Sequence, residues 1–139
     1  MEVVVYESIP DCAREIRKQV FEDEQGFQNE FDEKDAISTH IVLFDKDKVP
    51  VAACRIFHDV EKDSYILGRL AVVKEYRGKN IGSVVVGEAE RYVHKKGGKR
   101  IALHAQCRAS AFYAKLGYTE FGSIEEDEGC LHIWMRKHL

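Results

Sequence analysis

The order of apolar and polar residues along the chain predicts short strands that alternate with amphipathic helices. Runs rich in β-branched and aromatic residues between turn residues are typical of strands. Apolar residues that recur every three or four positions are typical of a helix with one buried face. The predicted strands are 2–6, 40–44, 51–57, 66–73, 101–103, 118–121 and 131–135, and the predicted helices are 8–25, 80–96 and 109–116.

Polar and glycine residues mark where these elements end. Ser8 and Asp11 are spaced as a capping pair at the start of the first helix, and Gly26 is placed to end it. Residues 45–48 predict a hairpin turn, and the acidic residues 125–128 predict another. Because hairpins occur among alternating strands and helices, the pattern favours an α/β fold with a mixed sheet and helices on both faces.

Length and composition fit a single domain made of residues 1–139. A hydrophobic fraction of 45% and a charged fraction of 32% are ordinary for a folded domain. The formal net charge of −3 argues against a nucleic-acid partner, because proteins that bind nucleic acids usually carry a basic surface. No stretch approaches the roughly 18 apolar residues that a membrane span needs, so no membrane partner is expected.

The cysteines and the first residues indicate the cytoplasm. The four cysteines are scattered, without a C-x-x-C pair or zinc-type spacing, which predicts free thiols and no metal site. An acid stands where a secretory signal would carry basic residues, and the apolar run beside it is too short for such a signal. We therefore expect a protein of the reducing cytoplasm.

Residues 70–83 carry the first candidate chemistry. A buried strand leads through a short basic loop with Gly78 into a helix that contains Gly82. This arrangement turns backbone N–H groups at the helix N-terminus toward one point, where the helix dipole favours a phosphate. Arg77 and Lys79 would supply counter-charge. Taken alone, the segment is equally compatible with a tight turn whose basic side chains are solvated.

The loop resembles the R/Q-x-x-G-x-G/A motif of the GNAT acetyltransferase superfamily, which holds the pyrophosphate of coenzyme A. Asn80 stands where the motif usually has its first glycine, and asparagine accepts a positive φ better than most residues. The resemblance also implies that the preceding strand offers main-chain groups to the pantetheine arm. The implied contacts with acetyl-CoA are Leu70, Ala71, Val72, Arg77, Gly78, Lys79, Asn80, Ile81, Gly82, Ser83, Gln106, Phe112 and Tyr113.

A second segment is similar to the same family. Residues 106–118 resemble its N-x-x-A-x-x-F-Y-x-x-L-G-F segment, with Gln106 in place of the common asparagine. Residues 17–25 and 129–135 are similar to the ElaA-like branch, whose substrates are poorly defined. The resemblance implies a GNAT-type, mostly antiparallel central sheet, acetyl-CoA as co-substrate and a possible homodimer.

The implied reaction transfers an acetyl group from acetyl-CoA to a primary amine of a small acceptor, by direct attack in a ternary complex. Tyr113 matches the family's tyrosine and is the candidate donor to the departing thiolate; its alternative role is a core aromatic beside Phe112. An amine is almost fully protonated at neutral pH, so a base is also needed. The candidate bases are Glu24 and His132, followed by His40 and His104.

Charged residues give further expectations for the acceptor end. Residues 22–35, which include a polar loop at 28–35, and residues 125–128 form two acidic clusters. If both border the cleft they would favour a cationic amine; otherwise they are solvated loops. Arg69 interrupts an apolar strand, so an ion-paired structural role is expected, with acceptor contact as the second possibility.

Two other functions stay open. A coenzyme A-binding sensor or interaction module without turnover would need the loop but not Tyr113. A protein N-acetyltransferase would use the same chemistry in an open groove, whereas a small acceptor favours a closed funnel. The single domain slightly favours the small acceptor.

Overall fold

The computed structural model describes residues 1–28 and 30–139. Most predicted elements are present near their expected positions. The elements are β1 (Glu2–Tyr6), α1 (Asp11–Arg17), the π-helix η1 (Lys18–Glu24), α2 (Lys34–Ile37), β2 (Thr39–Phe44), β3 (Pro50–Asp59), β4 (Ser64–Val72), the 3-10 helix η2 (Lys74–Tyr76), α3 (Ile81–Lys95), β5 (Arg100–Gln106), the 3-10 helix η3 (Cys107–Ala109), α4 (Ser110–Lys115), β6 (Thr119–Asp127) and β7 (Cys130–His138).

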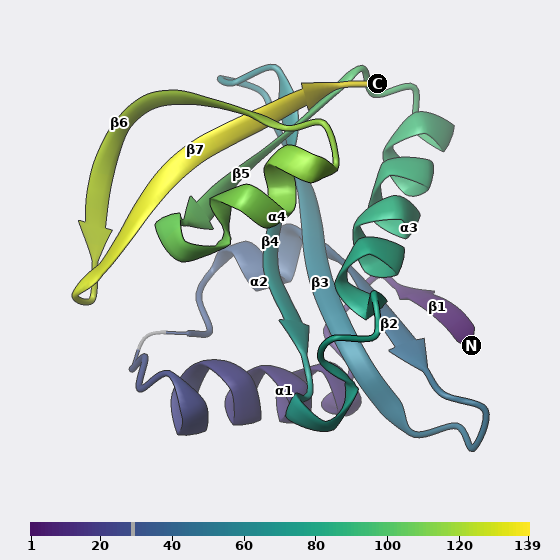
Figure 1. The fold of residues 1–139 in the computed structure, drawn as a ribbon. Coiled ribbons are helices and arrows are strands. Elements are labelled where there is room, and N and C mark those ends of the chain that lie inside the picture. Colours follow the sequence, from purple (N-terminus) through teal and green to yellow (C-terminus); the bar gives the residue numbers. More distant parts are fainter. Residues whose placement is uncertain (29) are drawn as a thin grey trace.

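The described strands form one sheet in the order β1-β2-β3-β4-β5-β7-β6. β4 and β5 are parallel, and the other neighbouring pairs are antiparallel. Figure 1 shows β1 at one edge and the curved β6–β7 pair at the other. The mixed, mostly antiparallel sheet is therefore confirmed.

Helices cover both faces of the centre of this sheet. α1 packs on β3 and β4, and α3 packs across β2, β3, β4 and β5. Consecutive residues of β3 from Val51 to Ile56 are all buried. Because successive side chains of a strand point to opposite faces, such a run requires cover on both sides. No helix of the described residues is long and apolar enough to cross a membrane.

Several element ends are shifted from the prediction, and two of these shifts have a clear structural reason. The first helix starts at Asp11 behind Pro10, and no side chain caps it, so Ser8 is not its cap. Residues 125–127 belong to β6, and the turn falls on Glu128 and Gly129. β6 is an edge strand with exposed residues on both faces, so it carries no apolar alternation from which its length could be predicted.

Two irregularities of β4 open the sheet at its centre. β4 pairs with β5 only at Tyr65–Ile101 and Ile66–Ala102. Its register against β3 shifts in the stretch opposite Ala53–Arg55. Within that stretch, Arg69 has a left-handed φ of +51°.

Candidate active site

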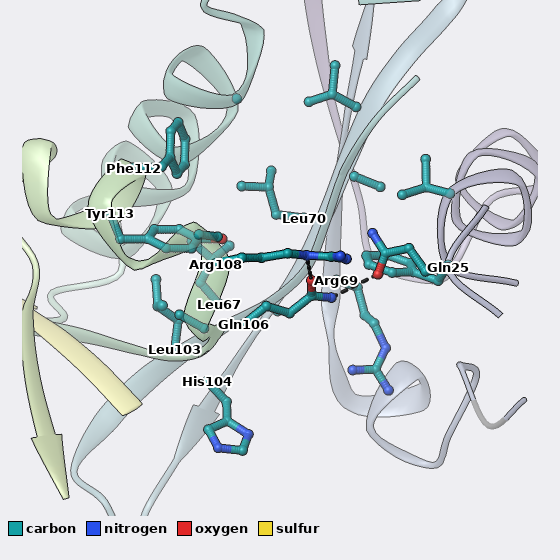
Figure 2. A pocket seen from close by; sticks show the side chains of 18 of the residues that line it. Gln25, Leu67, Arg69, Leu70, Leu103, His104, Gln106, Arg108, Phe112 and Tyr113 are labelled. Atoms are coloured by element: carbon teal, nitrogen blue, oxygen red, sulfur yellow. Dashed lines mark hydrogen bonds between the residues drawn. The ribbon is translucent and has the colours of Figure 1, made fainter. Parts of the chain in front are cut away.

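A cavity of about 1170 Å³ lies where β4 and β5 separate. Its walls come from η1 and the following loop, from both strands, from the loop before α3 and the start of α3, from α4, and from Asp127, Glu128 and His132 at or beside the turn between β6 and β7. Figure 2 shows Phe112 and Tyr113 on one side of the cavity and Gln25 on the other. The split in the sheet thus creates a space with backbone along its length and ionisable groups at its walls.

The loop before α3 has the geometry of an anion site. Gly78 and Asn80 both have left-handed φ, +76° and +65°, which confirms that Asn80 adopts the conformation expected of a glycine. Asn80 occupies the N-cap position, but its side chain caps no backbone N–H group. The first N–H groups of a helix have no partner within it. The first N–H groups of α3 start at Ile81, which lines the cavity, and an anion there would accept hydrogen bonds from them.

Gly82 leaves room for the ring of Phe112. A Cβ atom at this position would lie 3.1 Å from Cζ of Phe112. The absence of a side chain at Gly82 therefore lets the Phe112 ring pack against the first turn of α3. Both residues line the cavity.

Arg77 is bound by groups on two sides. Its Nε donates to the backbone oxygen of Val72 at 3.0 Å, and its two terminal nitrogens donate to the carboxylate of Glu24 at 2.8 and 2.9 Å. Arg77 lines the cavity, whereas Glu24 is not part of its lining. This pairing links the end of η1 to the anion-binding loop.

Tyr113 points its hydroxyl toward the cavity (Figure 2). Among the described residues no group hydrogen-bonds to this hydroxyl. Burial raises its pKa well above the usual range, with a smaller effect from Cys54. Tyr113 is therefore protonated at neutral pH and has an unused donor.

His132 is 7% exposed and lines the cavity. Its Nδ1 lies 2.9 Å from the backbone oxygen of Cys130. A carbonyl oxygen only accepts, so Nδ1 carries the hydrogen and Nε2 of the neutral ring holds a lone pair. His132 is thus able to accept a proton through Nε2.

His104 stacks between His132 and Trp134, with ring centroids 4.9 and 4.8 Å apart. Burial lowers its pKa, and the charge of His132 adds to this effect. Its buried Nε2 has no hydrogen-bond partner in the described residues, although Glu125 Oε1 is 3.4 Å away. Its main structural effect is to hold the ring of His132.

Beside the cavity, buried charges from four elements and one loop meet in an ion network. Its members are Arg17, Glu30, Asp32, Asp35, Arg55 and Arg69. Arg17 binds Glu30 at 2.8 Å and Asp35 at 2.7 Å. Burial alone would raise the pKa of Asp35. Hydrogen bonds from Arg17 and the Asp32 backbone outweigh this effect and lower the pKa to about 2. Within the predicted polar loop, Glu30 and Asp35 are therefore buried charges that are held by arginines, and Asp35 lies in α2.

Most residues expected from the sequence meet in this cavity. Those that line it are Arg69, Leu70, Ala71, Val72, Arg77, Gly78, Asn80, Ile81, Gly82, Ser83, His104, Gln106, Phe112, Tyr113 and His132. Lys79 and Glu24 are outside this lining; Lys79 places its ammonium 5.0 Å from the ring centre of Tyr76. His40 is buried, and its Nε2 contacts the Asp35 backbone oxygen at 3.1 Å.

A chain of hydrogen-bonded polar side chains that could not be predicted from the sequence runs across the cavity. Arg108 donates to Gln106 at 2.8 Å, and Gln106 donates to Gln25 at 2.9 Å. Figure 2 shows these contacts as dashed lines. Gln106 was expected here from its motif, but no pattern in the sequence shows that Gln25, 81 residues earlier, is its partner.

The overall fold is similar to that of solved N-acetyltransferase structures. An N-acetyltransferase from Lactobacillus plantarum is 25% identical, with a TM-score of 0.91 and coverage of 99% of this chain and 97% of the other. Escherichia coli ElaA is 24% identical, with a TM-score of 0.84 and coverage of 98% of each chain. An aminoglycoside 6'-N-acetyltransferase solved with coenzyme A shares the fold at 17% identity, with a TM-score of 0.74 and coverage of 99% and 97%.

The chain belongs to the GNAT acetyltransferase family. The family's sequence profile, described as an acetyltransferase (GNAT) domain, matches residues 5–139. A Bacillus subtilis (strain 168) protein named as an acetyltransferase is 36% identical over 130 residues, which cover 90% of this chain and 86% of that protein. The protein is therefore an acetyl-CoA-dependent N-acetyltransferase, and the resemblance found in its motifs is confirmed.

Proposed function

We propose that this chain, as a single domain, transfers an acetyl group from acetyl-CoA to a primary amine of a small acceptor by direct attack in a ternary complex. The observation that carries this proposal is the continuous cavity, which has the open N-terminus of α3, the Tyr113 hydroxyl and His132 in its walls. One cavity can then hold both reactants, with no need for a covalent enzyme intermediate. The four free cysteines fit a reducing cytoplasm as the site of the reaction.

In this proposal the residues expected from the family motif bind the cofactor. The N–H groups at the start of α3 and the side chain of Arg77 bind the pyrophosphate, and β4 from Leu70 to Val72 offers its main chain to the pantetheine arm. Coenzyme A bound to an aminoglycoside 6'-N-acetyltransferase of the same fold supports this assignment. A main-chain N–H near Val72 would stabilise the charge that develops on the thioester oxygen.

The chemistry requires two proton movements. His132 Nε2 accepts a proton from the amine, directly or through water, and the amine nitrogen attacks the thioester carbon. The carbon–sulfur bond then breaks while Tyr113 donates a hydrogen bond to the departing thiolate. The proton that remains on the acylated nitrogen passes to this thiolate, which leaves as the free thiol. Complete transfer from a tyrosine to a thiolate is uphill by about 2 kcal/mol in water. Because burial raises the pKa of Tyr113 further, its role is to stabilise the thiolate rather than to give up its proton permanently.

Glu24 is the second candidate base. Arg77 holds both of its oxygens, so Glu24 can accept a proton only after Arg77 has turned to the pyrophosphate. The competing role of Glu24 is to orient Arg77.

The experiment that tests the proposal measures free thiol released from acetyl-CoA by purified protein with a panel of small amines. We expect thiol release that depends on the amine, and thermal stabilisation by acetyl-CoA of about 2.7 kcal/mol at 100 times its Kd. Binding without thiol release would favour a coenzyme A sensor. Acetylation of protein lysines but not of small amines would favour a protein N-acetyltransferase.

A further inference from the structure

Four of the seven acidic residues at positions 22–35 are paired with arginines. The ion network pairs three carboxylates with three arginines, and Glu24 is paired with Arg77. A cationic acceptor is therefore favoured only by the second acidic cluster, from which Asp127 and Glu128 line the cavity. Positive charge from Arg69 and Arg108 lines the same cavity.

Arg69 is the arginine of the ion network that lines the cavity. Its Nε donates to the Glu30 backbone oxygen at 2.8 Å, and its Nη2 donates to Asp32 at 3.3 Å. Nη1 has no hydrogen-bond partner among the described residues. The side chain is 28% exposed and lines the cavity. Arg69 thus keeps Nη1 donors in the cavity wall to which no described residue is bonded, while Nε and Nη2 are fixed by hydrogen bonds.

The surroundings of Arg69 favour an additional anion. Burial lowers the pKa of Arg69, and the positive charge of Arg55 lowers it further. Each of these effects is larger than the opposing effect of Glu30 or of Asp32. An anion beside the guanidinium would relieve this repulsion. The left-handed φ of Arg69 is uncommon for a residue with a side chain, and such conformations cluster at functional sites.

Arg108 adds a second positive charge to the same cavity. Its Nε is bound to Gln106, and its two terminal nitrogens have no hydrogen-bond partner among the described residues. Figure 2 shows Arg69 and Arg108 among the side chains around the cavity. A guanidinium presents paired N–H groups that match the geometry of a carboxylate or a phosphate.

We infer that the acceptor is an amine that also carries an anionic group, a carboxylate or a phosphate, and that Arg69 binds this group inside the cavity. Arg108 contributes positive potential at the same place. This inference rests on the proposed function, since it names the class of amine that the same site acetylates.

The first test compares matched acceptors in the thiol-release assay. 4-Aminobutyrate is compared with its neutral amide and with 1,4-diaminobutane, and ethanolamine phosphate is compared with ethanolamine; glycine and β-alanine vary the distance between amine and carboxylate. We expect kcat/KM for the anionic member of the preferred pair to be about tenfold higher or more, the value of one charge-assisted hydrogen-bonded contact. The two pairs separate a carboxylate from a phosphate.

Variants then connect the preference to Arg69. Arg69→Gln should bring the ratio of anionic to neutral kcat/KM close to one, and Arg69→Lys should retain part of it. Arg108→Gln is an exposed change that should lower the ratio less. The matched control is Arg91→Gln, on α3 outside the cavity and with a side chain 67% exposed, which should leave the ratio unchanged. Because each ratio is taken within one protein, a general loss of turnover does not affect it.

A binding measurement keeps the inference separate from the proposed function. In protein labelled at arginine, the Arg69 Nε–H resonance should move on addition of 4-aminobutyrate or ethanolamine phosphate, but not of their neutral partners. Turnover that prefers neutral or cationic amines, with no such movement, would overturn the inference and leave the acetyltransferase function intact. Absence of both thiol release and acetyl-CoA binding would instead overturn the proposed function.

Discussion

The carboxylate of Glu24 holds both terminal nitrogens of Arg77, 53 residues away, at 2.8 and 2.9 Å. Arg77 is therefore engaged before any cofactor arrives, and it must exchange a carboxylate for the pyrophosphate that we propose it binds. Glu24→Gln should remove this competition.

We expect Glu24→Gln to tighten acetyl-CoA binding by roughly two- to fivefold and to change the free energy of unfolding by less than about 1 kcal/mol, as is usual for exposed ion pairs. Titration calorimetry with acetyl-CoA measures the first quantity and urea unfolding the second. Weaker binding would mean that Glu24 orients Arg77 for the cofactor. A fall in kcat of a hundredfold or more would make Glu24 the base.

Gly82 and Gly87 provide a matched pair within α3. A Cβ atom at Gly82 would meet Phe112 at 3.1 Å, whereas one at Gly87 would meet nothing within 4 Å. Gly87→Ala should stabilise the helix by about 0.5–1 kcal/mol. Gly82→Ala should stabilise the helix less than Gly87→Ala and should weaken acetyl-CoA binding. Gly82→Val should abolish acetyl-CoA binding. Thermal unfolding with and without acetyl-CoA measures both effects. Equal behaviour of the two alanine variants would contradict a special role for Gly82.

Tyr113→Phe removes only the hydroxyl that faces the cavity. We expect kcat to fall by roughly 10²–10⁴, the usual scale for one acid–base group, with little change in acetyl-CoA affinity. The control is Tyr92→Phe, which removes a hydroxyl bonded to Thr39 at 2.9 Å outside the cavity. It should lose about 1 kcal/mol of stability and no turnover. Full activity of Tyr113→Phe under conditions where chemistry limits the rate would return Tyr113 to a packing role.

His132→Gln tests the proposed base. Turnover should fall by roughly 10²–10⁴ at neutral pH, because the amine would lose its proton acceptor. His94→Gln, an exposed change on α3, is the control and should leave turnover unchanged. Steady-state rates of thiol release measure both. If the His132→Gln enzyme keeps the wild-type kcat, His132 is not the base. Glu24 would then be the next candidate to test.

Asp35→Asn tests the ion network through pH. The pKa of Asp35 is lowered to about 2 in the folded protein, from about 3.9 in an unfolded chain. Its stabilisation is therefore complete above pH ~4 and is lost as the pH falls toward 2. At pH 7 we expect Asp35→Asn to cost about 3–5 kcal/mol, because it leaves buried arginine charge unpaired. Urea unfolding should show this cost shrinking between pH ~4 and pH ~2.

The control for Asp35 is Asp63→Asn. The Asp63 side chain is 85% exposed and pairs with Arg100 at 3.0 Å. Its φ of +48° suits asparagine. This variant should cost less than about 1 kcal/mol. A cost for Asp35→Asn that stays constant down to pH ~2 would show that the carboxylate charge does not stabilise the fold.

The anion-binding loop could be predicted from the sequence because its determinants are local. Gly78 and Asn80 specify their own left-handed conformations, and the following apolar period specifies the helix. The ion network could not be predicted, since its pairs join residues 13 to 39 positions apart in separate segments of the chain. Arg69 was placed correctly in an ion pair, but its open Nη1 depends on how the β4 bulge turns its side chain.

β7 lies between β5 and β6 in the sheet although it follows both in the chain. During synthesis β6 therefore emerges before β7, its one partner among the described strands, and it waits with two unpaired edges. Unpaired strands of nascent chains are sites of misassembly, and charges along such strands oppose it. β6 carries Glu120, Glu125, Glu126 and Asp127. These charges therefore oppose pairing of β6 with other chains, both before β7 is available and at the edge that β6 forms in the finished sheet.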